Sequence, residues 1–353
     1  MAELHASQMS DADARRSLDE LLGRFNCRVH QPGDAPLFTP DPQSSMIPLH
    51  WKWSDLSPLL ARIGGHLKLE AKGNRRTLRL TNPGLPYGTT PTFWGSIQVI
   101  LPGEAATAHR HAASALRFIM KGHGAFTTVD GEEYPMNEGD FVITPAMTWH
   151  DHVHRGDEPM IWLDVLDISL VRAMHATFFE GFTTDLQTVS DYPRRSLQQF
   201  GSGIMRPVRP QVHNQVNPLL AYPAERALAA LSAAAELPPD SYCDTQLEYQ
   251  NPTNGGPALP TIGTRLQRLR PNSRCLPQRH TGSVLNYVMD GNGKTVVNGE
   301  SFEWGPGDFI AIPPWSWYEH TNTTQNAATL FQVNDIPALQ ALGLYREEFA
   351  AVS

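Results

Sequence analysis

The sequence predicts an all-β protein made of two copies of a small β-barrel or sandwich. The chain has 353 residues, which fits two domains or one duplicated unit with enough bulk to bury real cores. Its 29 prolines and 27 glycines lie between short apolar runs, a pattern typical of short strands joined by many turns. One β pattern also occurs twice along the chain, which favours duplication.

The duplication is carried by glycines, hairpin residues and one strand motif. In order, the first copy reads GHG (122–124), DG (130–131) and EGDFVITPAMTWHDH (138–152), and the second reads GNG (291–293), NG (298–299) and PGDFIAIPPWSWYEH (306–320). Gly131 to Gly139 is eight residues, and so is Gly299 to Gly307. Asp-Gly and Asn-Gly favour tight hairpins, so each copy is expected to be one β unit.

Five segments follow from this pattern. In chain order they are an N-terminal helix and arm (1–74), a first barrel (75–170), a linker region (171–260), a second barrel (261–335) and a C-terminal helix (336–353). An amphipathic helix is expected over 11–24, and the proline-rich residues 28–60 are expected to wrap over the body or over a partner subunit. The clearest helix of the linker region is 223–237, with Pro223 near its first turn.

Charge and composition exclude several classes of protein. The net charge is -8 and no lysine-rich block occurs, so nucleic acid is not expected as a partner. The N-terminus has no apolar signal region and no stretch is long enough to span a membrane, so we expect a cytoplasmic protein without membrane attachment. The three cysteines stand far apart, without the spacing of a zinc or redox site.

Histidines gather in the first β unit. His109 and His111 are two residues apart on a predicted strand, so their side chains share one face. His150, His152 and His154 share a face of another strand in the same way. Imidazoles that converge from two strands inside a barrel form a potential metal site, although imidazole suits zinc, copper and nickel as well as iron.

The spacing of these histidines resembles a known superfamily. The matching residues, in order, are Gly103, His109, His111, Gly122, Gly139, Pro145 and His150. They resemble the two signature motifs of the cupin superfamily, and the duplication makes the chain similar to a bicupin, with two double-stranded β-helix (jelly-roll) barrels and a few peripheral helices. Further segments, in order NPGL (82–85), FWGSIQ (93–98), HRHAASALRF (109–118), PMIWLDVLD (159–167) and YQNPTNGG (249–256), resemble the gentisate and salicylate 1,2-dioxygenases.

Two departures from the cupin motifs are informative. Ala115 stands where many cupins place a glutamate ligand, and Met147 replaces the usual glycine after the proline. The resemblance therefore implies three neutral ligands, His109, His111 and His150. Such ligands do not cancel any of the metal's positive charge, and they leave three coordination positions open for a bidentate acid and O2. In the second unit the equivalent residues are Gln278, His280 and Tyr318, so we expect that barrel to be metal-free and structural.

An acidic chain needs local cations to bind an anionic substrate. Arg117 lies six residues after His111, so a regular strand places it on the ligand face, where a guanidinium can grip a carboxylate with two hydrogen bonds. The family match implies the same role for Arg117. It also implies a pocket formed by Arg75, Trp94, Ser96, Gln98, His152 and Asp164. His152 and Asp164 are the catalytic candidates, as donors, acceptors or proton carriers toward the substrate. We expect His123 and His154 to face solvent.

The resemblance implies one Fe(II) per chain, in the first barrel, and no organic cofactor. The implied reaction opens gentisate with O2 to maleylpyruvate, between the carboxyl-bearing and the adjacent hydroxyl-bearing carbons. Salicylate or 1-hydroxy-2-naphthoate remain alternative substrates. A cupin isomerase or decarboxylase, or a non-enzymatic cupin that acts in storage or as a small-acid sensor, remains an alternative from another class. Family members are commonly tetramers, so a homotetramer is expected.

Overall fold

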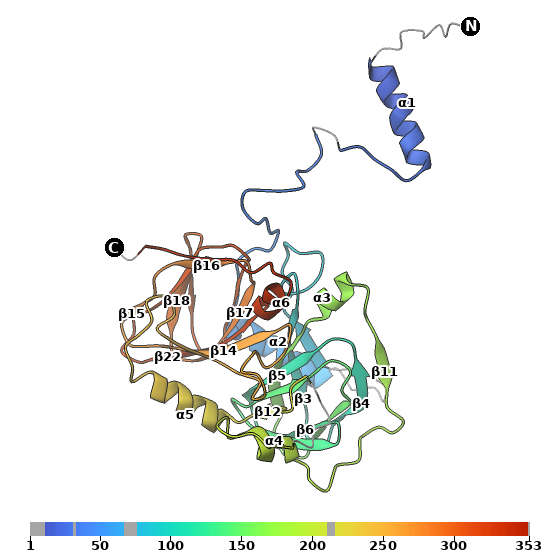
Figure 1. Cartoon of the computed structure of the whole chain (residues 1–353). Helices are drawn as coiled ribbons and strands as arrows, with labels where there is room; N and C mark the ends of the chain where they lie inside the picture. The colour runs from blue at the N-terminus through green and yellow to red at the C-terminus, as the bar shows by residue number, and fades with distance from the viewer. Residues whose placement is uncertain (1–10, 31–32, 67–75, 210–215, 352–353) are drawn as a thin grey trace, which may run out of the picture. The chain divides into compact units, whose positions relative to one another are not determined.

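The computed structural model describes residues 11–30, 33–66, 76–209 and 216–351. The chain divides into two compact units, Met1–Asp41 and Pro42–Ser353. The first unit contains α1 (Asp11–Arg24), where a helix was expected. The second unit contains both barrels, which Figure 1 shows in blue to green and in orange to red. Among the described helices, none has the length and apolarity that a membrane span requires.

The first barrel consists of two facing antiparallel sheets. The first of these, its back sheet, has the order β12 (Ala221–Tyr222), β8 (Phe141–Thr144), β5 (Ala115–Lys121), β10 (Met160–Leu166), β3 (Trp94–Ile100) and β2 (Arg76–Arg79). The second, its front sheet, has the order β11 (Phe179–Gly181), β4 (Ala105–His111), β9 (His150–His154), β6 (Ala125–Val129) and β7 (Glu132–Met136). α3 (Ile168–Ala173) follows β10, and α4 (Arg195–Phe200) lies in the linker region.

The second barrel repeats this arrangement. Its back sheet has the order β1 (Leu49–Trp51), β20 (Phe309–Ile312), β17 (Val284–Asp290), β22 (Ala328–Asn334), β14 (Gly263–Leu269) and β13 (Thr245–Glu248). Its front sheet has the order β19 (Glu300–Trp304), β18 (Gly293–Val297), β21 (Tyr318–Asn322), β16 (Gln278–His280) and β23 (Glu347–Phe349), with β15 (Ser273–Arg274) beside β21. The predicted fold class, two β-barrels with few helices, is confirmed.

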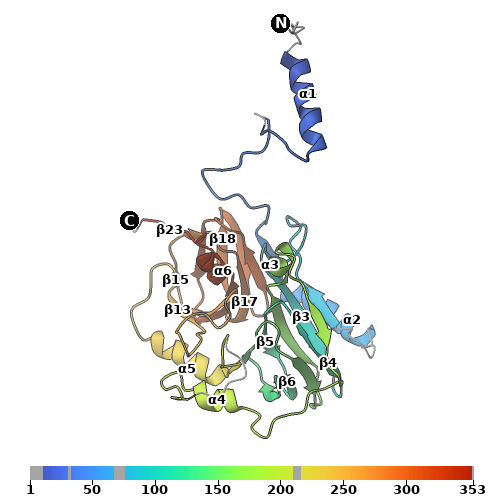
Figure 2. The ribbon, with the colours of Figure 1, turned by 45° about the vertical axis from the view of Figure 1, so that its right-hand side comes forward.

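The two back sheets pack against each other and bury the largest core of the chain. Phe118 of β5 stacks on Phe331 of β22, with ring centroids 3.9 Å apart and planes 20° apart. Tyr287 and Phe141 extend this aromatic layer on either side. Figure 2 shows β5 and β17 side by side at this interface. Alternation along β5 therefore places Phe118 between the barrels and Arg117 inside the first barrel.

Each barrel is preceded by a strand and a helix that dock on the other barrel. β1 pairs with β20, and Asp308 accepts a hydrogen bond of 2.7 Å from the Trp53 amide at the start of α2 (Trp53–His66). In the same way β12 pairs with β8, and Asp140 accepts from the Ala224 amide at 2.8 Å, at the start of α5 (Ala224–Ala234). The Gly-Asp motif of each copy thus holds the helix that precedes the other copy.

The proline-rich segment contains a strand and a helix that the sequence analysis did not predict. Residues 42–66 are built into the body as β1 and α2, and Met46, Leu56 and Leu60 are buried in its core. Pro58 lies inside α2, five residues after its start, and burial of the apolar side chains outweighs the unfavourable helix propensity of proline.

The closing helix is also shorter than expected. α6 (Ile336–Ala341) ends before Gly343, whose φ of 70° suits glycine and stops the helix. The chain then forms β23, which pairs with β16 of the second barrel. The helix expected over 223–237 is present as α5, between residues 224 and 234.

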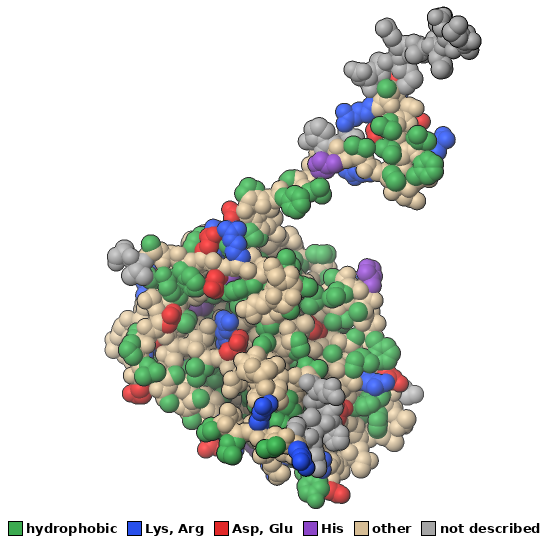
Figure 3. Space-filling model, viewed as in Figure 1, with side chains coloured by type: hydrophobic (Ala, Val, Ile, Leu, Met, Phe, Trp, Pro, Cys, Tyr) green, Lys and Arg blue, Asp and Glu red, His purple; other side chains and the backbone are tan. Residues whose placement is uncertain are grey.

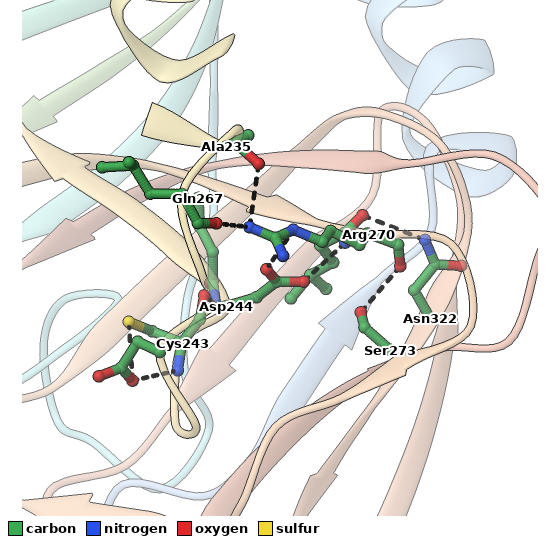
Figure 4. A network of polar contacts seen from close by, with 10 residues as sticks. Ala235, Cys243, Asp244, Gln267, Arg270, Ser273 and Asn322 are labelled. Atoms are coloured by element: carbon green, nitrogen blue, oxygen red, sulfur yellow. Dashed lines mark hydrogen bonds and ion pairs between the residues drawn. The ribbon is translucent and has the colours of Figure 1, made fainter. Parts of the chain in front are cut away.

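One polar network ties α5 to the second barrel (Figure 4). Arg270, after β14, donates to the carbonyls of Ala235 and Leu237 at the C-terminal end of α5. Its Nε lies 3.3 Å from Asp244 Oδ1 in an ion pair. A cation is favourable there because the carbonyls at a helix C-terminus lack helical partners. Over the described residues on the face in Figure 3, basic side chains lie scattered among acidic ones rather than gathered into one basic surface.

Candidate active site

Three histidines meet inside the first barrel. His109 and His111 come from β4, and His150 comes from β9, directly opposite His109 in the strand register. The ring centroids lie 4.2 Å apart for His109 and His150, 4.8 Å for His111 and His150, and 5.5 Å for His109 and His111. One nitrogen from each ring can lie within 4.8 Å of the others, which suits one metal ion.

The backbone sets the tautomer of all three rings. Nδ1 of His109 lies 2.8 Å from the Thr107 carbonyl, Nδ1 of His111 lies 2.7 Å from the Ala113 carbonyl, and Nδ1 of His150 lies 3.1 Å from the Thr148 carbonyl. A carbonyl only accepts, so each Nδ1 carries the proton and each Nε2 keeps a lone pair for a metal.

The local charge also keeps His150 neutral. Burial lowers its pKa well below 6.5, and the Arg117 guanidinium and the neighbouring imidazoles lower it further. Among the described residues, the buried Nε2 of His150 has no hydrogen-bond partner. A neutral imidazole with an unshared buried nitrogen fits a metal ligand, so the residues present suit the metal that the sequence implied.

Arg117 and Asp164 lie side by side next to this triad. They are direct partners in the register of β5 and β10, and Arg117 Nε lies 3.2 Å from Asp164 Oδ1. Arg117 also donates to Thr144 Oγ1 at 3.1 Å. Arg117 is 1% exposed, and burial lowers its pKa while Asp164 raises it. A buried cation requires such a partner, and Asp164 supplies it.

The pair still has capacity to bind a ligand. Although the two atoms are close, the N–H does not point at the oxygen, and within the described residues neither Arg117 Nε nor Asp164 Oδ1 has a hydrogen-bond partner. Buried polar atoms are rarely left without partners. A bound ligand with acceptor and donor oxygens would satisfy both.

The other expected pocket residues line the same face of the back sheet. Ser96 is the register partner of Asp164, and Gln98 is the partner of Trp162. Trp94 continues this face toward the rim, where its ring contacts Tyr87 at 4.3 Å and lies under the Arg79 guanidinium at 4.4 Å. The structure therefore brings Trp94, Ser96, Gln98, Asp164 and Arg117 together on one inward surface.

His152 and His154 occupy different surroundings. His152 is fully buried two residues after His150, with its ring 5.7 Å from that of Trp162. His154 was expected to face solvent, but it is 1% exposed, and its Nε2 lies 2.6 Å from the Glu158 carbonyl. The expectation was wrong because the turn after β9 folds back over the ring. His123 is exposed, as expected, and Arg75 lies outside the described residues.

Two contacts of the site were not predicted from the sequence. β11 pairs with β4 along the ligand strand, and Phe179 stacks on His109 with centroids 5.3 Å apart and planes 26° apart. No periodic pattern marks this segment, so the sequence offers no means of finding it. Met147 takes a φ of 65°, and its amide donates to the His111 carbonyl at 2.8 Å. This left-handed geometry explains why related motifs place glycine there.

The equivalent positions of the second barrel bind other parts of the chain. Gln278 donates to the Tyr242 carbonyl at 2.9 Å, and the Tyr318 hydroxyl lies 3.3 Å from His280 Nε2. Burial raises the pKa of Tyr318 and lowers that of His280 to about 4. A neutral phenol is a poor metal ligand. Among the described residues, His109, His111 and His150 form the one cluster of three potential ligands of this kind. That the second barrel is metal-free stays a prediction.

The comparisons with known proteins agree with this architecture. The Cupin domain family matches residues 96–166 and again residues 265–334. Two such barrels in one chain define a bicupin.

Longer similarities narrow the class. A 5-aminosalicylate 1,2-dioxygenase of Comamonas sp. is 37% identical over 97% of this chain and 91% of its own length. A gentisate 1,2-dioxygenase of Streptomyces sp. is 37% identical over 96% and 97%. The solved salicylate 1,2-dioxygenase from Pseudaminobacter salicylatoxidans is 30% identical, with a TM-score of 0.87 over 97% of this chain and 99% of that one. The chain belongs to the gentisate and salicylate 1,2-dioxygenase family and is an oxidoreductase of the dioxygenase type.

Proposed function

We propose that the protein is an Fe(II)-dependent dioxygenase that opens the ring of a hydroxybenzoate, with gentisate converted by O2 to maleylpyruvate. One observation carries the proposal: the three histidines that can bind a metal lie next to the buried pair Arg117–Asp164. Among the described residues, Arg117 Nε and Asp164 Oδ1 have no hydrogen-bond partner. The names of the relatives support the substrate class, because they act on gentisate, 5-aminosalicylate and salicylate. A solved salicylate 1,2-dioxygenase adduct with gentisate, 31% identical to this chain, supports it further.

His109, His111 and His150 would hold the iron through Nε2, one ion per chain. When bound, Fe(II) supplies a positively charged centre with open positions at which an acid and O2 can be brought together and polarised. No organic cofactor enters the proposal. Ala115, which is fully buried, leaves the position of a fourth protein ligand without a carboxylate.

Arg117 binds the substrate carboxylate in this proposal. Its guanidinium has five donors, of which one is used by Thr144, so four remain and two of these can make a bidentate contact. Asp164 Oδ1 accepts a hydrogen bond from a ring hydroxyl and keeps Arg117 oriented. Removal of this aspartate would leave a buried guanidinium without a counter-charge.

The remaining pocket residues orient the ring. Trp94, Ser96 and Gln98 extend the inward face that carries Arg117, two strands away in the same sheet, and Arg75 is proposed to complete the pocket. His152 hydrogen-bonds the substrate oxygens or carries a proton between them. The small Ser96 side chain sets the width available to the ring. The pocket excludes bulk water, since Arg117, Asp164 and His152 are all buried.

A second substrate is favoured by one specific observation. The Comamonas relative acts on 5-aminosalicylate, in which an amino group stands where gentisate has its second hydroxyl. Both groups donate electron density to the ring carbon that is attacked. Salicylate and 1-hydroxy-2-naphthoate, the substrates named for other relatives, lack this donor and are the slower alternatives.

The test is a panel of acids offered to the Fe(II)-loaded protein in an oxygen electrode. We expect one O2 per gentisate, with 5-aminosalicylate next and with salicylate and 1-hydroxy-2-naphthoate slowest. Absence of oxygen uptake with all four acids would overturn the proposal and favour a cupin that isomerises, decarboxylates or only binds small acids. We also propose a cytoplasmic homotetramer, and elution at monomer size in gel filtration would contradict the tetramer.

A further inference from the structure

Two buried aspartates, Asp167 and Asp335, each link the two barrels by hydrogen bonds to a serine of one barrel and a threonine of the other. We call each aspartate with its serine and threonine a clasp. Asp167, just after β10, accepts from the Ser114 amide at 2.8 Å and from the Thr261 hydroxyl at 2.5 Å. Asp335, just after β22, accepts from the Ser283 amide at 2.7 Å and from the Thr92 hydroxyl at 2.5 Å, and its Oδ2 also accepts from the Ser283 hydroxyl at 2.8 Å. In each case the serine belongs to the same barrel as the aspartate, and the threonine precedes the first long strand of the other barrel.

The first clasp lies against the metal site. Ser114 directly follows Ala113, whose carbonyl accepts the Nδ1 proton of His111 at 2.7 Å. The Ser114 hydroxyl also accepts from the Ala146 amide at 3.3 Å, in the turn that contacts the His111 carbonyl. A shift of the Ser114 backbone would therefore rotate the peptide that orients the His111 ring.

The same segment determines where β5 begins. Ala115 is the first residue of β5, and Arg117 follows two residues later on the inward face. Asp167 thus holds the one turn that joins a metal ligand to the proposed carboxylate-binding residue. Because Asp167 and Ser114 are both at most 5% exposed, water does not compete for the bond.

We propose that Asp167 and Thr261 are positioning residues of the active site, so that the C-terminal barrel, through Thr261, fixes the orientation of His111 and Arg117. The proposal rests on the metal site described under the proposed function. It gives the second barrel a role in the chemistry of the first. The clasp of Asp335, Ser283 and Thr92 lies next to His280, in the barrel expected to hold no metal. It therefore provides a control for changes that do not concern the metal site.

The experiment compares Thr261→Val with Thr92→Val. Each change removes one hydroxyl that donates at 2.5 Å to a buried aspartate across the barrel interface. Both threonines are partly buried, but Asp335 Oδ2 keeps the Ser283 hydroxyl as a donor, so we expect a smaller loss of thermal stability in Thr92→Val than in Thr261→Val. The affinity for Co(II), used as a spectroscopic metal probe, should fall about tenfold in Thr261→Val, at the lower end of the effect of losing an outer partner of a ligand. The absorption bands of the bound Co(II) should also shift in Thr261→Val. Thr92→Val should bind Co(II) like the wild type, and Thr261→Ser should restore wild-type binding.

Equal Co(II) affinities and spectra in Thr261→Val, Thr92→Val and the wild type would overturn the proposal, as would equal losses in the two valine variants. Co(II) binding needs no turnover. The clasp is therefore tested even if the wild type consumes no oxygen with any acid, and that result would remove the proposed function alone. If oxygen is consumed, Thr261→Val should lower kcat and raise KM together, because both the metal ligand and Arg117 move.

Discussion

Replacing Arg117 by methionine removes the proposed carboxylate-binding cation while keeping a side chain of similar length. Two charge-assisted hydrogen bonds to the substrate are lost, each worth about 1.5–3 kcal/mol. At about 1.4 kcal/mol per tenfold, the dissociation constant of gentisate should rise at least about 100-fold. Iron content should remain one per chain, because Arg117 does not contact the ligand nitrogens of the proposed metal site.

The same change should also destabilise the fold. Asp164 would be left as a buried carboxylate without its ion-pair partner at 3.2 Å, which costs about 3–5 kcal/mol. The double variant Arg117→Met with Asp164→Leu removes both charges, so it should regain most of the stability without regaining the affinity. Arg270→Met, which breaks the ion pair with Asp244 in the second barrel, is the control for a generic loss of stability.

The assay is anaerobic calorimetric titration of the iron-loaded variants with gentisate, with thermal unfolding measured in parallel. The reasoning predicts weak binding in both Arg117 variants and wild-type affinity in Arg270→Met. Wild-type affinity in Arg117→Met would refute the assignment of the carboxylate site. Recovery of affinity in the double variant would show that the arginine serves only to balance Asp164.

Three further predictions follow from particular contacts. Ala115→Glu places a carboxylate where related barrels carry a ligand, so KM for gentisate should rise at least about tenfold with iron retained, and an unchanged KM would show that the vacancy is unimportant. Burial raises the pKa of Asp167 from 3.8 to about 6, so ionisation of this carboxyl opposes folding. Its contribution to the free energy of unfolding is therefore fully present below pH 3.8 and is lost as the pH rises through 6. The stability of Asp167→Asn relative to wild type should therefore improve by about 1.4 kcal/mol between about pH 5 and about pH 7.5 in chemical denaturation, and a pH-independent difference would contradict this. Phe118→Ala should lower the free energy of unfolding by about 3–5 kcal/mol, because it leaves a cavity beside Phe331. A loss below about 1 kcal/mol would show that the stability of the fold does not depend on this contact between the barrels.

Spacing along single strands accounts for what the sequence predicted well. His109 and His111 share a face because they are two residues apart, and the Gly-Asp repeat revealed the second barrel directly. The features that the sequence analysis missed or predicted wrongly depend on tertiary contacts. α2 forms despite Pro58 because its apolar side chains are buried, and His154 is covered by a turn that local pattern does not specify.

Other features of the site lie between segments far apart in the chain. Phe179 reaches His109 only because β11 adds to β4, and Thr261 reaches Asp167 across the barrel interface from a position 94 residues later. Neither contact leaves a periodic pattern in the sequence. The pairing of Arg117 with Asp164 is intermediate, since both residues were proposed for the pocket but their direct register became visible only in the sheet.

The most direct test of the central claim is turnover of gentisate by the Fe(II)-loaded protein under isotopically labelled O2. The account predicts one O2 consumed per gentisate and labelled oxygen in the new carboxyl group of maleylpyruvate, with both lost in His150→Ala. Ring-opened product without the label, or undiminished turnover in His150→Ala, would contradict it.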